Sequence, residues 1–173
     1  MKASFILLIA IYLLCNATRF YYEILKKNGK IDIESKLFFA FIFSIMCLMW
    51  ISWFSACPQD IWHLGLPTVI KWAGLGVFIL GALLAFGALF QLRGVENINH
   101  LVTNGLFARF RHPMYTGFIL WIIGWAIYHD AIISSIAGIP GIANILYWRY
   151  LEDRDLEKKY GLIYANYRSQ TWF

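Results

Sequence analysis

The sequence predicts an all-α fold, an integral membrane helical bundle of about five transmembrane helices. First, 60% of the 173 residues are apolar and only 14% are charged, whereas a soluble domain carries about 25% charged and 45–50% apolar residues. Second, the apolar residues form runs that approach or reach the roughly 17–25 residues of a spanning helix. Third, the connections between the runs alternate between basic and non-basic, the pattern that orients membrane proteins. We therefore expect a single membrane domain over residues 1–173.

The first three crossings are predicted from long apolar segments. Residues 3–22 form the first segment, residues 37–56 contain no charge at all, and residues 66–90 contain a single lysine near their start. Small residues four positions apart allow helices to approach closely in lipid. Gly81 and Ala85 have this spacing, so the third helix is expected to pack tightly against a neighbour.

The fourth apolar region, residues 113–148, is long enough for two short helices. His129 and Asp130 lie in its middle, where we expect a polar turn. Pro140 should bend the second of these helices, because proline removes a backbone hydrogen bond and clashes with the preceding turn. The last pair of helices is therefore expected to be short, kinked or tilted.

The placement of lysine and arginine predicts how the bundle is oriented. With five crossings, all but Lys2 and Lys71 of the 15 basic residues fall on one side of the membrane. These residues are Arg19, Lys26, Lys27, Lys30, Lys36, Arg93, Arg109, Arg111, Arg149, Arg154, Lys158, Lys159 and Arg168. Basic loops stay in the cytoplasm, so the N-terminus is expected outside and the C-terminal tail inside. The net charge of +5 then reflects orientation and indicates no nucleic-acid surface.

The tail is expected to form an amphipathic helix over residues 152–167. Leu156, Tyr160 and Tyr164 fall on one face, while Lys158 and Lys159 add charge to another. Such a helix could lie on the cytoplasmic membrane surface. It could equally close over a site formed by the loop that precedes the fourth helix.

That loop, residues 91–112, is polar and long for a connection in so small a protein. It is rich in His, Asn and Arg, and it ends at His112 directly before Pro113. A proline in the first helical turn leaves neighbouring N–H groups available to an acceptor. His112 is therefore a candidate for a cofactor site at the helix mouth, although a histidine at a helix start is more often structural.

Glu152 and Asp153 also have two interpretations. They form either a solvated acidic helix start, which the helix dipole favours, or a carboxylate placed against a cationic ligand. A metal site is not expected, because the histidines lie on different loops without ligand spacing. These histidines are His63, His100, His112 and His129. The three cysteines form no CxxC or metal spacing either.

Two blocks of sequence stand out in the C-terminal half. Residues 101–107 read Leu-Val-Thr-Asn-Gly-Leu-Phe, and residues 111–117 read Arg-His-Pro-Met-Tyr-Thr-Gly. The second block consists of Glu152, Asp153, Leu156, Tyr160, Gly161, Tyr164 and Tyr167. Together the blocks closely resemble the signature of the isoprenylcysteine carboxyl methyltransferases and the related phospholipid methyltransferases. The first two helices match that family only in being apolar.

The resemblance implies S-adenosylmethionine as cofactor, held without a Rossmann fold in a site formed by residues 91–117 and 148–167. Glu152 matches the family carboxylate that contacts the cofactor. The other matching positions wrap the cofactor or adjoin it: His100, Leu101, Val102, Phe107, His112, Pro113, Met114 and Tyr115. The implied acceptor is lipophilic, and its best candidate is the carboxylate of a prenylated cysteine or a similar group. A phospholipid amine is the alternative.

One position departs from the family pattern. The family carries a substrate-side arginine four residues before the glutamate, but that position is Trp148 here, and Arg149 follows it. A shift of one residue turns a helical side chain by about 100°, so Arg149 is a candidate catalytic residue whose role is in doubt. Asp153 replaces a second family glutamate, which is a milder change.

Two other classes of function remain open at this point. Membrane reductases of the NADPH-dependent sterol type carry a similar Arg-His-Pro-x-Tyr stretch, although Met114, Gly117 and Phe118 depart from their pattern. A non-catalytic membrane interaction protein that keeps the fold is the other possibility, and the displaced arginine favours it. The expected partners are a lipophilic or lipidated substrate and membrane lipids. The sequence predicts no particular oligomeric state.

Overall fold

The computed structural model describes residues 3–30, 36–92 and 101–173. The helices are α1 (Ala3–Lys27), α2 (Lys36–Ala56), α3 (Thr68–Leu92), α4 (Pro113–Tyr128), α5 (Ile132–Tyr160) and α6 (Leu162–Gln170). Two short 3-10 helices, η1 (Cys57–Gln59) and η2 (Gly105–Ala108), lie in the connections. Across these ranges no strand forms, and a single bridge joins Phe110 to Trp172.

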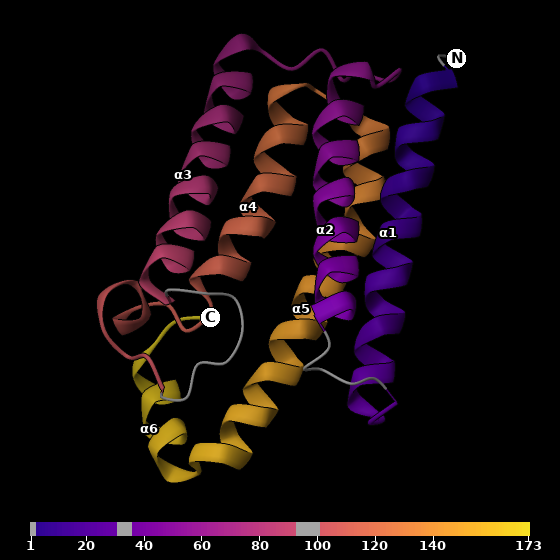
Figure 1. The fold of residues 1–173 in the computed structure, drawn as a ribbon. Coiled ribbons are helices and arrows are strands. Elements are labelled where there is room, and N and C mark those ends of the chain that lie inside the picture. Colours follow the sequence, from indigo (N-terminus) through magenta and orange to yellow (C-terminus); the bar gives the residue numbers. More distant parts are fainter. Residues whose placement is uncertain (1–2, 31–35, 93–100) are drawn as a thin grey trace.

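Helices α1 to α5 run alternately in opposite directions, as Figure 1 shows. Of the described helices, α1, α2 and α3 are long and apolar enough to span a membrane, and α4 is a shorter apolar helix. The expected all-α membrane bundle is thus confirmed, with the fourth helix short. The turn between α4 and α5 falls at His129 and Asp130, as expected.

Small residues let α3 and α4 pack almost backbone to backbone. A Cβ added to Gly117 would lie 2.5 Å from the carbonyl oxygen of Gly81 and 2.7 Å from the amide nitrogen of Ala85. One added to Gly124 would lie 2.4 Å from the amide nitrogen of Phe78. The predicted close packing at Gly81 and Ala85 is therefore confirmed, and α4 is the neighbour.

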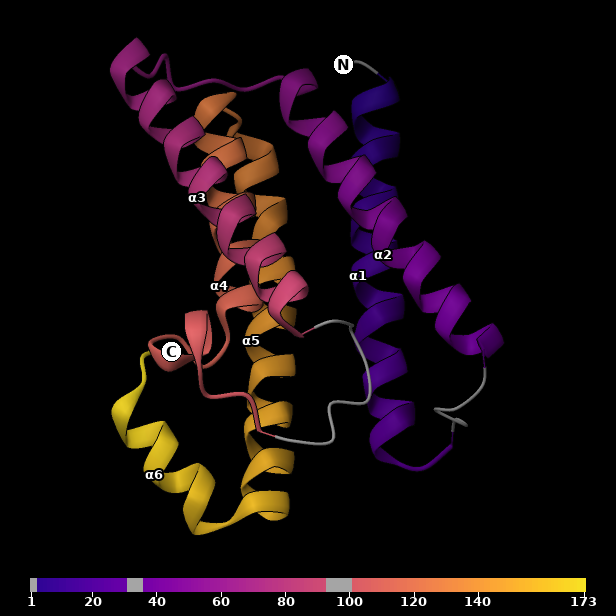
Figure 2. The ribbon, with the colours of Figure 1, turned by 60° about the vertical axis from the view of Figure 1, so that its left-hand side comes forward.

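Helix α2 leaves the bundle toward one end. Near the C-terminal end of α2 this helix touches α3 through Phe54 and Phe78, whose ring centroids are 5.7 Å apart. Toward its N-terminal end α2 leans away from α4 and α5, as Figure 2 shows. The core stays continuous on the other side, where Tyr12 of α1, Trp53 of α2 and Ile145 of α5 are all buried.

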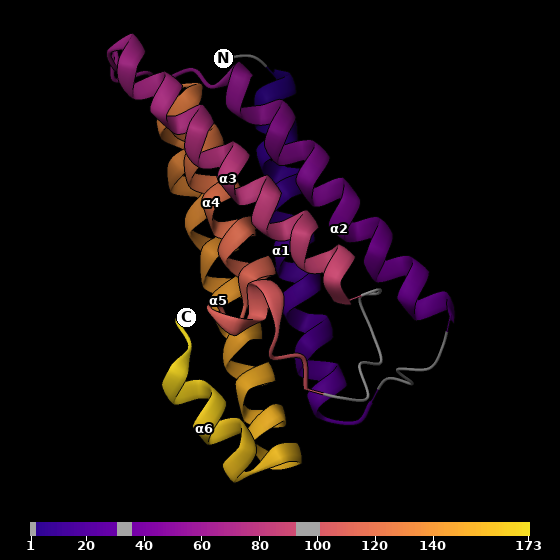
Figure 3. The same ribbon diagram turned by 90° about the vertical axis from the view of Figure 1, so that its left-hand side faces the viewer.

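The tail differs from the expected single helix over residues 152–167. Helix α5 continues through Pro140 without a break and extends to Tyr160. The chain then turns at Gly161, whose φ of 53° suits a residue without a side chain. Helix α6 runs back beside the lower half of α5 (Figure 3). The amphipathic tail is therefore the end of α5 together with α6.

The C-terminus is tied to the loop before α4. The amide groups of Arg111 and His112 donate to the carbonyl oxygens of Trp172 and Phe173, at 2.9 and 3.2 Å. The amide of Trp172 donates to the carbonyl oxygen of Arg109 at 2.8 Å. These bonds fix the segment around His112 against the end of the chain.

Two buried aspartates fasten the opposite end of the bundle. Asp130 accepts hydrogen bonds from the amides of three consecutive residues, Leu64, Gly65 and Leu66. Asp60 accepts from both the amide and the hydroxyl of Ser134, each at 2.7 Å. The loop between α2 and α3 is thereby joined to the turn between α4 and α5.

Candidate active site

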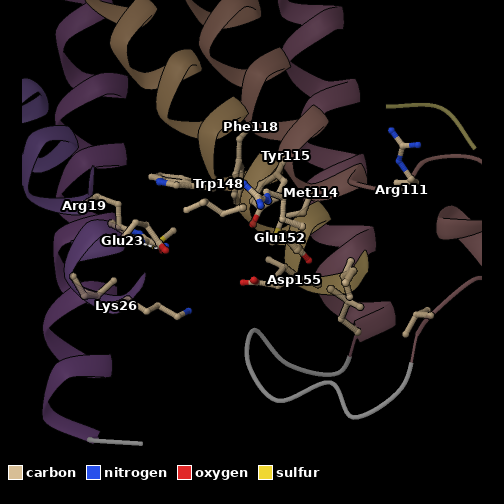
Figure 4. Close-up of a pocket in the computed structure, with 18 of the residues that line it drawn as sticks. Arg19, Glu23, Lys26, Arg111, Met114, Tyr115, Phe118, Trp148, Glu152 and Asp155 are labelled. Carbon is tan, nitrogen blue, oxygen red and sulfur yellow. Dashed lines mark hydrogen bonds and ion pairs between the residues drawn. The ribbon is translucent and has the colours of Figure 1, made fainter. Parts of the chain in front are cut away.

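A cavity of about 1120 Å³ lies at the end of the bundle where α2 diverges. Its upper wall is apolar, and charged side chains from α1 and α5 surround its mouth (Figure 4). The apolar wall includes Ile42, Met46, Trp50, Phe118 and Trp121. Ligand pockets commonly measure about 300–1,000 Å³, so this cavity has room for a polar ligand and a lipidic one together.

The cavity extends between α2 and α3. Its lining includes Phe39 and Phe43 of α2 as well as Leu89 and Leu92 of α3. The two phenylalanines are themselves exposed at the molecular surface. An apolar molecule in the surrounding lipid could therefore reach the cavity sideways.

Beside the cavity, His112 joins two acidic side chains of α5. Its Nε2 lies 2.7 Å from Oδ1 of Asp153, and its Nδ1 lies 3.6 Å from Oε2 of Glu152. The Tyr164 hydroxyl donates to the same Asp153 oxygen. His112 is only 4% exposed, so this network fastens the start of α4 to α5 and α6.

Burial and hydrogen bonding shift the pKa values of His112 and Asp153 in opposite directions. Burial alone would lower the pKa of His112, but its hydrogen bonds to Asp153 and Glu152 raise the pKa above the usual value of 6.5. Burial would raise the pKa of Asp153, yet hydrogen bonds from His112 and Tyr164 lower it from 3.8 to about 2. Both shifts therefore favour the ion pair of imidazolium and carboxylate over the neutral pair.

Two further contacts hold the loop that precedes α4. The Tyr167 hydroxyl of α6 donates to the carbonyl oxygen of Phe107 at 2.6 Å. Gln91 of α3 donates to the carbonyl oxygen of Asn104 at 2.6 Å and accepts from the amide of Leu106. Phe107 is thus fixed in the cavity wall from both sides.

A family model described as phospholipid methyltransferase matches residues 64–162, which contain the whole of α3, α4 and α5. The chain belongs to the phospholipid methyltransferase family. The matched range includes Phe107, Tyr115 and Glu152 of the cavity wall.

The curated relatives that the chain matches are named as methyltransferases of one kind, the isoprenylcysteine O-methyltransferases. The chain is 31% identical over 108 residues to protein-S-isoprenylcysteine O-methyltransferase of Homo sapiens, covering 56% of this chain and 36% of the relative. The Tribolium castaneum enzyme of that name is 34% identical over 114 residues, covering 57% and 38%. Form B of Arabidopsis thaliana is 30% identical over 114 residues, covering 57% and 55%. The match thus spans little more than half of even the shortest of these relatives, and no solved structure matches.

Most of the residues that the family resemblance predicts to bind the cofactor lie around this cavity. Six of them line the cavity: Leu101, Val102, Phe107, Met114, Tyr115 and Glu152. His112 and Pro113 do not, since both are buried behind the wall. His100 lies outside the described residues. His112 nevertheless supports the wall, because its ring stacks on that of Tyr115 at a centroid distance of 5.5 Å.

The one-residue shift from the family pattern has a visible consequence. Trp148 lines the cavity, whereas Arg149 is absent from the described lining. The Arg149 guanidinium instead lies 4.1 Å from the ring centroid of Phe173, and its Nε lies 3.7 Å from Oδ2 of Asp153. Arg149 therefore stabilises the end of the chain, and its position gives no support to a role in catalysis.

Sequence analysis missed the contribution of α1. Arg19 and Glu23 form an ion pair one helical turn apart, and both line the cavity. Helix α1 extends to Lys27, so these residues lie on a helix and not in a loop. An arginine and a glutamate four positions apart at the end of an apolar helix were the available signal. No family motif covers this part of the chain.

Proposed function

We propose that the protein transfers a methyl group from S-adenosylmethionine to the carboxylate of a lipophilic acceptor, best represented by a prenylated cysteine. The observation that carries this is the cavity, which joins a charged mouth to an apolar interior open toward lipid. Membership of the phospholipid methyltransferase family and the names of the relatives support the reaction class. The reductase interpretation gains no support from them.

The cavity wall fits a cationic methyl donor. The side chain of Glu152 is 46% exposed and reaches the cavity, and the rings of Tyr115 and Phe107 line the same space. Carboxylates and aromatic faces both attract a cation. We assign donor binding to these residues together with Leu101, Val102 and Met114, with His112 and Pro113 fixing their backbone, and with His100 as a further expected contact.

S-adenosylmethionine supplies an electrophilic methyl group on a positively charged sulfur. Transfer to a carboxylate forms one C–O bond and breaks one C–S bond, the bonding pair leaves on the sulfur, and no proton moves. The protein therefore has to position both groups and exclude water. The apolar wall of Trp50, Phe118 and Trp121 serves that purpose.

The acid–base chemistry of the site favours a carboxylate over an amine acceptor. A protonated amine would first have to lose a proton to a base. None of the described residues lining the cavity is a histidine, and the hydrogen bonds of His112 to Asp153 and Glu152 raise its pKa and so favour its protonated form over the free base. A phospholipid amine, which the family description suggests, remains the second candidate acceptor.

The placement of charge supports an active site facing the cytoplasm. The cavity mouth contains Lys26, Lys27, Arg154, Lys158 and Lys159, and basic residues are retained on the cytoplasmic side of membrane proteins. In this orientation the water-soluble donor enters from the cytoplasm. The acceptor enters from the lipid between α2 and α3.

Calorimetric titration of the detergent-purified protein tests the donor first. Saturable binding of S-adenosylhomocysteine, with none of NADPH, is expected. Incubation with methyl-labelled S-adenosylmethionine and either N-acetyl-S-farnesylcysteine or phosphatidylethanolamine then separates the two acceptors. Label in the farnesylcysteine ester supports the proposal, and label in the phospholipid alone selects the second candidate. Binding of neither cofactor would remove the enzymatic interpretation.

A further inference from the structure

The cavity wall contains a candidate anion-binding side chain, Arg19, which belongs to neither of the two sequence blocks. If a carboxylate acceptor enters, as the proposed function requires, a cation should orient it. Arg149 does not reach the described cavity wall, and Trp148 occupies the position that faces it. The guanidinium of Arg19, from the other side of the cavity, lies over the Trp148 ring at 4.6 Å from its centroid.

Arg19 is held in a defined position. Its Nη1 donates to Oε1 of Glu23, one turn further along α1. The side chains of Arg19 and Glu23 are only 14% and 12% exposed. Figure 4 shows Arg19 and Glu23 extending from α1 toward Trp148 and Glu152. A guanidinium that is fixed by stacking and by one ion pair loses little further freedom when it binds a ligand.

Part of this guanidinium is left without a partner. Within the described part of the chain, the Nε of Arg19 is buried and makes no hydrogen bond. A buried donor without an acceptor costs free energy. The pair with Glu23 uses Nη1, so the guanidinium, which lines the cavity, keeps further N–H donors for a carboxylate, and a carboxylate can accept two parallel hydrogen bonds from it.

The other cations of the cavity are less suited to this task. Lys27, Arg154, Lys158 and Lys159 are exposed at the mouth, where water and salt screen their charges. Lys26 is half-buried there, but its ammonium group is a point charge without the planar fork of a guanidinium. Arg111 also has a buried Nε without a hydrogen bond in the described residues, but its Nη1 donates to the carbonyl oxygen of Arg168, which ties it to α6. Arg19 alone among these described cations stacks on the aromatic ring at position 148.

We propose that Arg19 binds the carboxylate of the lipophilic acceptor, in place of the arginine that position 148 lacks. Glu23 acts as a positioning residue that holds the guanidinium against Trp148. The cation thus lies on α1, whereas the residues assigned to the donor lie on α4, on α5 and in the loop before α4, on the other side of the cavity. This inference rests on the proposed function.

Binding of a matched pair of probes tests the proposal. N-acetyl-S-farnesylcysteine carries the carboxylate, and its carboxamide lacks the charge but keeps the lipid chain. Both are titrated into protein saturated with S-adenosylhomocysteine, for the wild type, Arg19→Gln, Arg19→Lys and Arg149→Gln. Arg19→Gln should weaken the carboxylate probe by about 10- to 100-fold, as the loss of a charged hydrogen-bonded pair predicts, and leave the carboxamide unchanged within about twofold.

The remaining variants decide between the two arginines. Arg19→Lys keeps the charge without the planar fork, so its loss should be intermediate. Arg149→Gln should leave the ratio of the two affinities as in the wild type. Loss of carboxylate preference in Arg149→Gln, or its retention in Arg19→Gln, would overturn the proposal. If Arg19→Gln fails to fold, the ratio in Arg19→Lys decides, and a wild-type ratio there counts against Arg19.

Failure of this proposal and failure of the proposed function remain distinct. A wild-type protein that binds no S-adenosylhomocysteine contradicts the function itself. A wild-type protein that binds S-adenosylhomocysteine and the carboxylate probe, with the same preference after Arg19→Gln, contradicts only the role of Arg19.

Discussion

Glu152 is the acidic side chain of the His112 network that reaches the cavity. Its carboxylate faces the space assigned to the donor, so Glu152→Gln should weaken S-adenosylmethionine binding by about fivefold, the order expected of about 1 kcal/mol for a half-exposed charge pair. S-adenosylhomocysteine, whose sulfur is neutral, should lose less. Titration of both ligands measures the difference. Glu157→Gln, on the same helix but outside the described lining, is the control, and equal losses for both ligands would place the sulfonium elsewhere.

The pair of His112 and Asp153 predicts how stability changes with pH. The pKa of His112 is raised above 6.5, so its contribution is fully present below that pH and is lost as the pH rises through the raised value. The pKa of Asp153 is lowered to about 2, so its contribution is present above 3.8 and is lost only in strong acid. The melting temperature should therefore fall from pH 6 to pH 9, as measured by thermal unfolding in detergent.

His112→Gln tests that assignment. Removing one partner of a buried ion pair costs about 3–5 kcal/mol, so the variant should melt lower than the wild type at pH 6. Because the titrating group is gone, the fall between pH 6 and pH 9 should be smaller than in the wild type. An unchanged slope would assign the pH dependence to another group.

At the residue scale, sequence alone selected residues on one side of the cavity but none on the side that α1 forms. Phe107, Tyr115 and Glu152 belong to blocks with fixed spacing, and all three line the cavity. Arg19 belongs to no such block. Its role depends on α1 packing beside α5, where Asn144 donates to the side-chain and backbone oxygens of Asn16. Nothing local in the sequence pairs those two helices.

At the element scale, the seam between α3 and α4 positions one wall of the cavity. Gly117→Ala would place a Cβ 2.5 Å from the backbone of α3, and forced overpacking costs about 1–3 kcal/mol. The variant should melt at a lower temperature and bind S-adenosylhomocysteine more weakly, because Met114 and Tyr115 lie one turn away on α4.

Gly76→Ala is the matched control for that seam. Among the described residues nothing lies within 4 Å of a Cβ added there, and alanine favours a helix over glycine by about 1 kcal/mol. Its melting temperature should equal or exceed that of the wild type. Similar behaviour of the two variants would show that α3 and α4 do not pack as closely as the structure has them.

The helices themselves were largely predictable, because runs of apolar residues and the alternation of basic loops are long-range averages over many side chains. The ends of helices were not. Helix α1 was expected to end at residue 22 but continues to Lys27, and the tail helix was expected from residue 152 but is continuous with α5. Charged residues continue a helix as readily as apolar ones. Only Gly161, with its positive φ, ends α5.

Across the whole molecule, hydrogen bonds join the loops at one end of the bundle, whereas the other end contains the cavity. Asp60 and Asp130 tie the loops at the first end, while α2 diverges at the second and leaves the apolar part of the cavity between α2 and α3. The length of that apolar part should limit the lipid chain that the protein accepts. Helix α2 supplies its outer wall, so a bulkier side chain there should shorten it.

Met46→Trp tests this limit. Met46 lines the cavity, and tryptophan would fill space that the lipid chain otherwise occupies. Compared with the wild type, the variant should lose more affinity for N-acetyl-S-farnesylcysteine than for the shorter geranyl analogue. Its affinity for S-adenosylhomocysteine should be unchanged. Leu48→Trp is the control, because Leu48 is exposed and lies outside the described lining; two residues along a helix turn a side chain by about 200°. If both variants bind the two probes as the wild type does, the lipid chain does not run along α2, and the space beside Leu89 and Leu92 of α3 becomes its path.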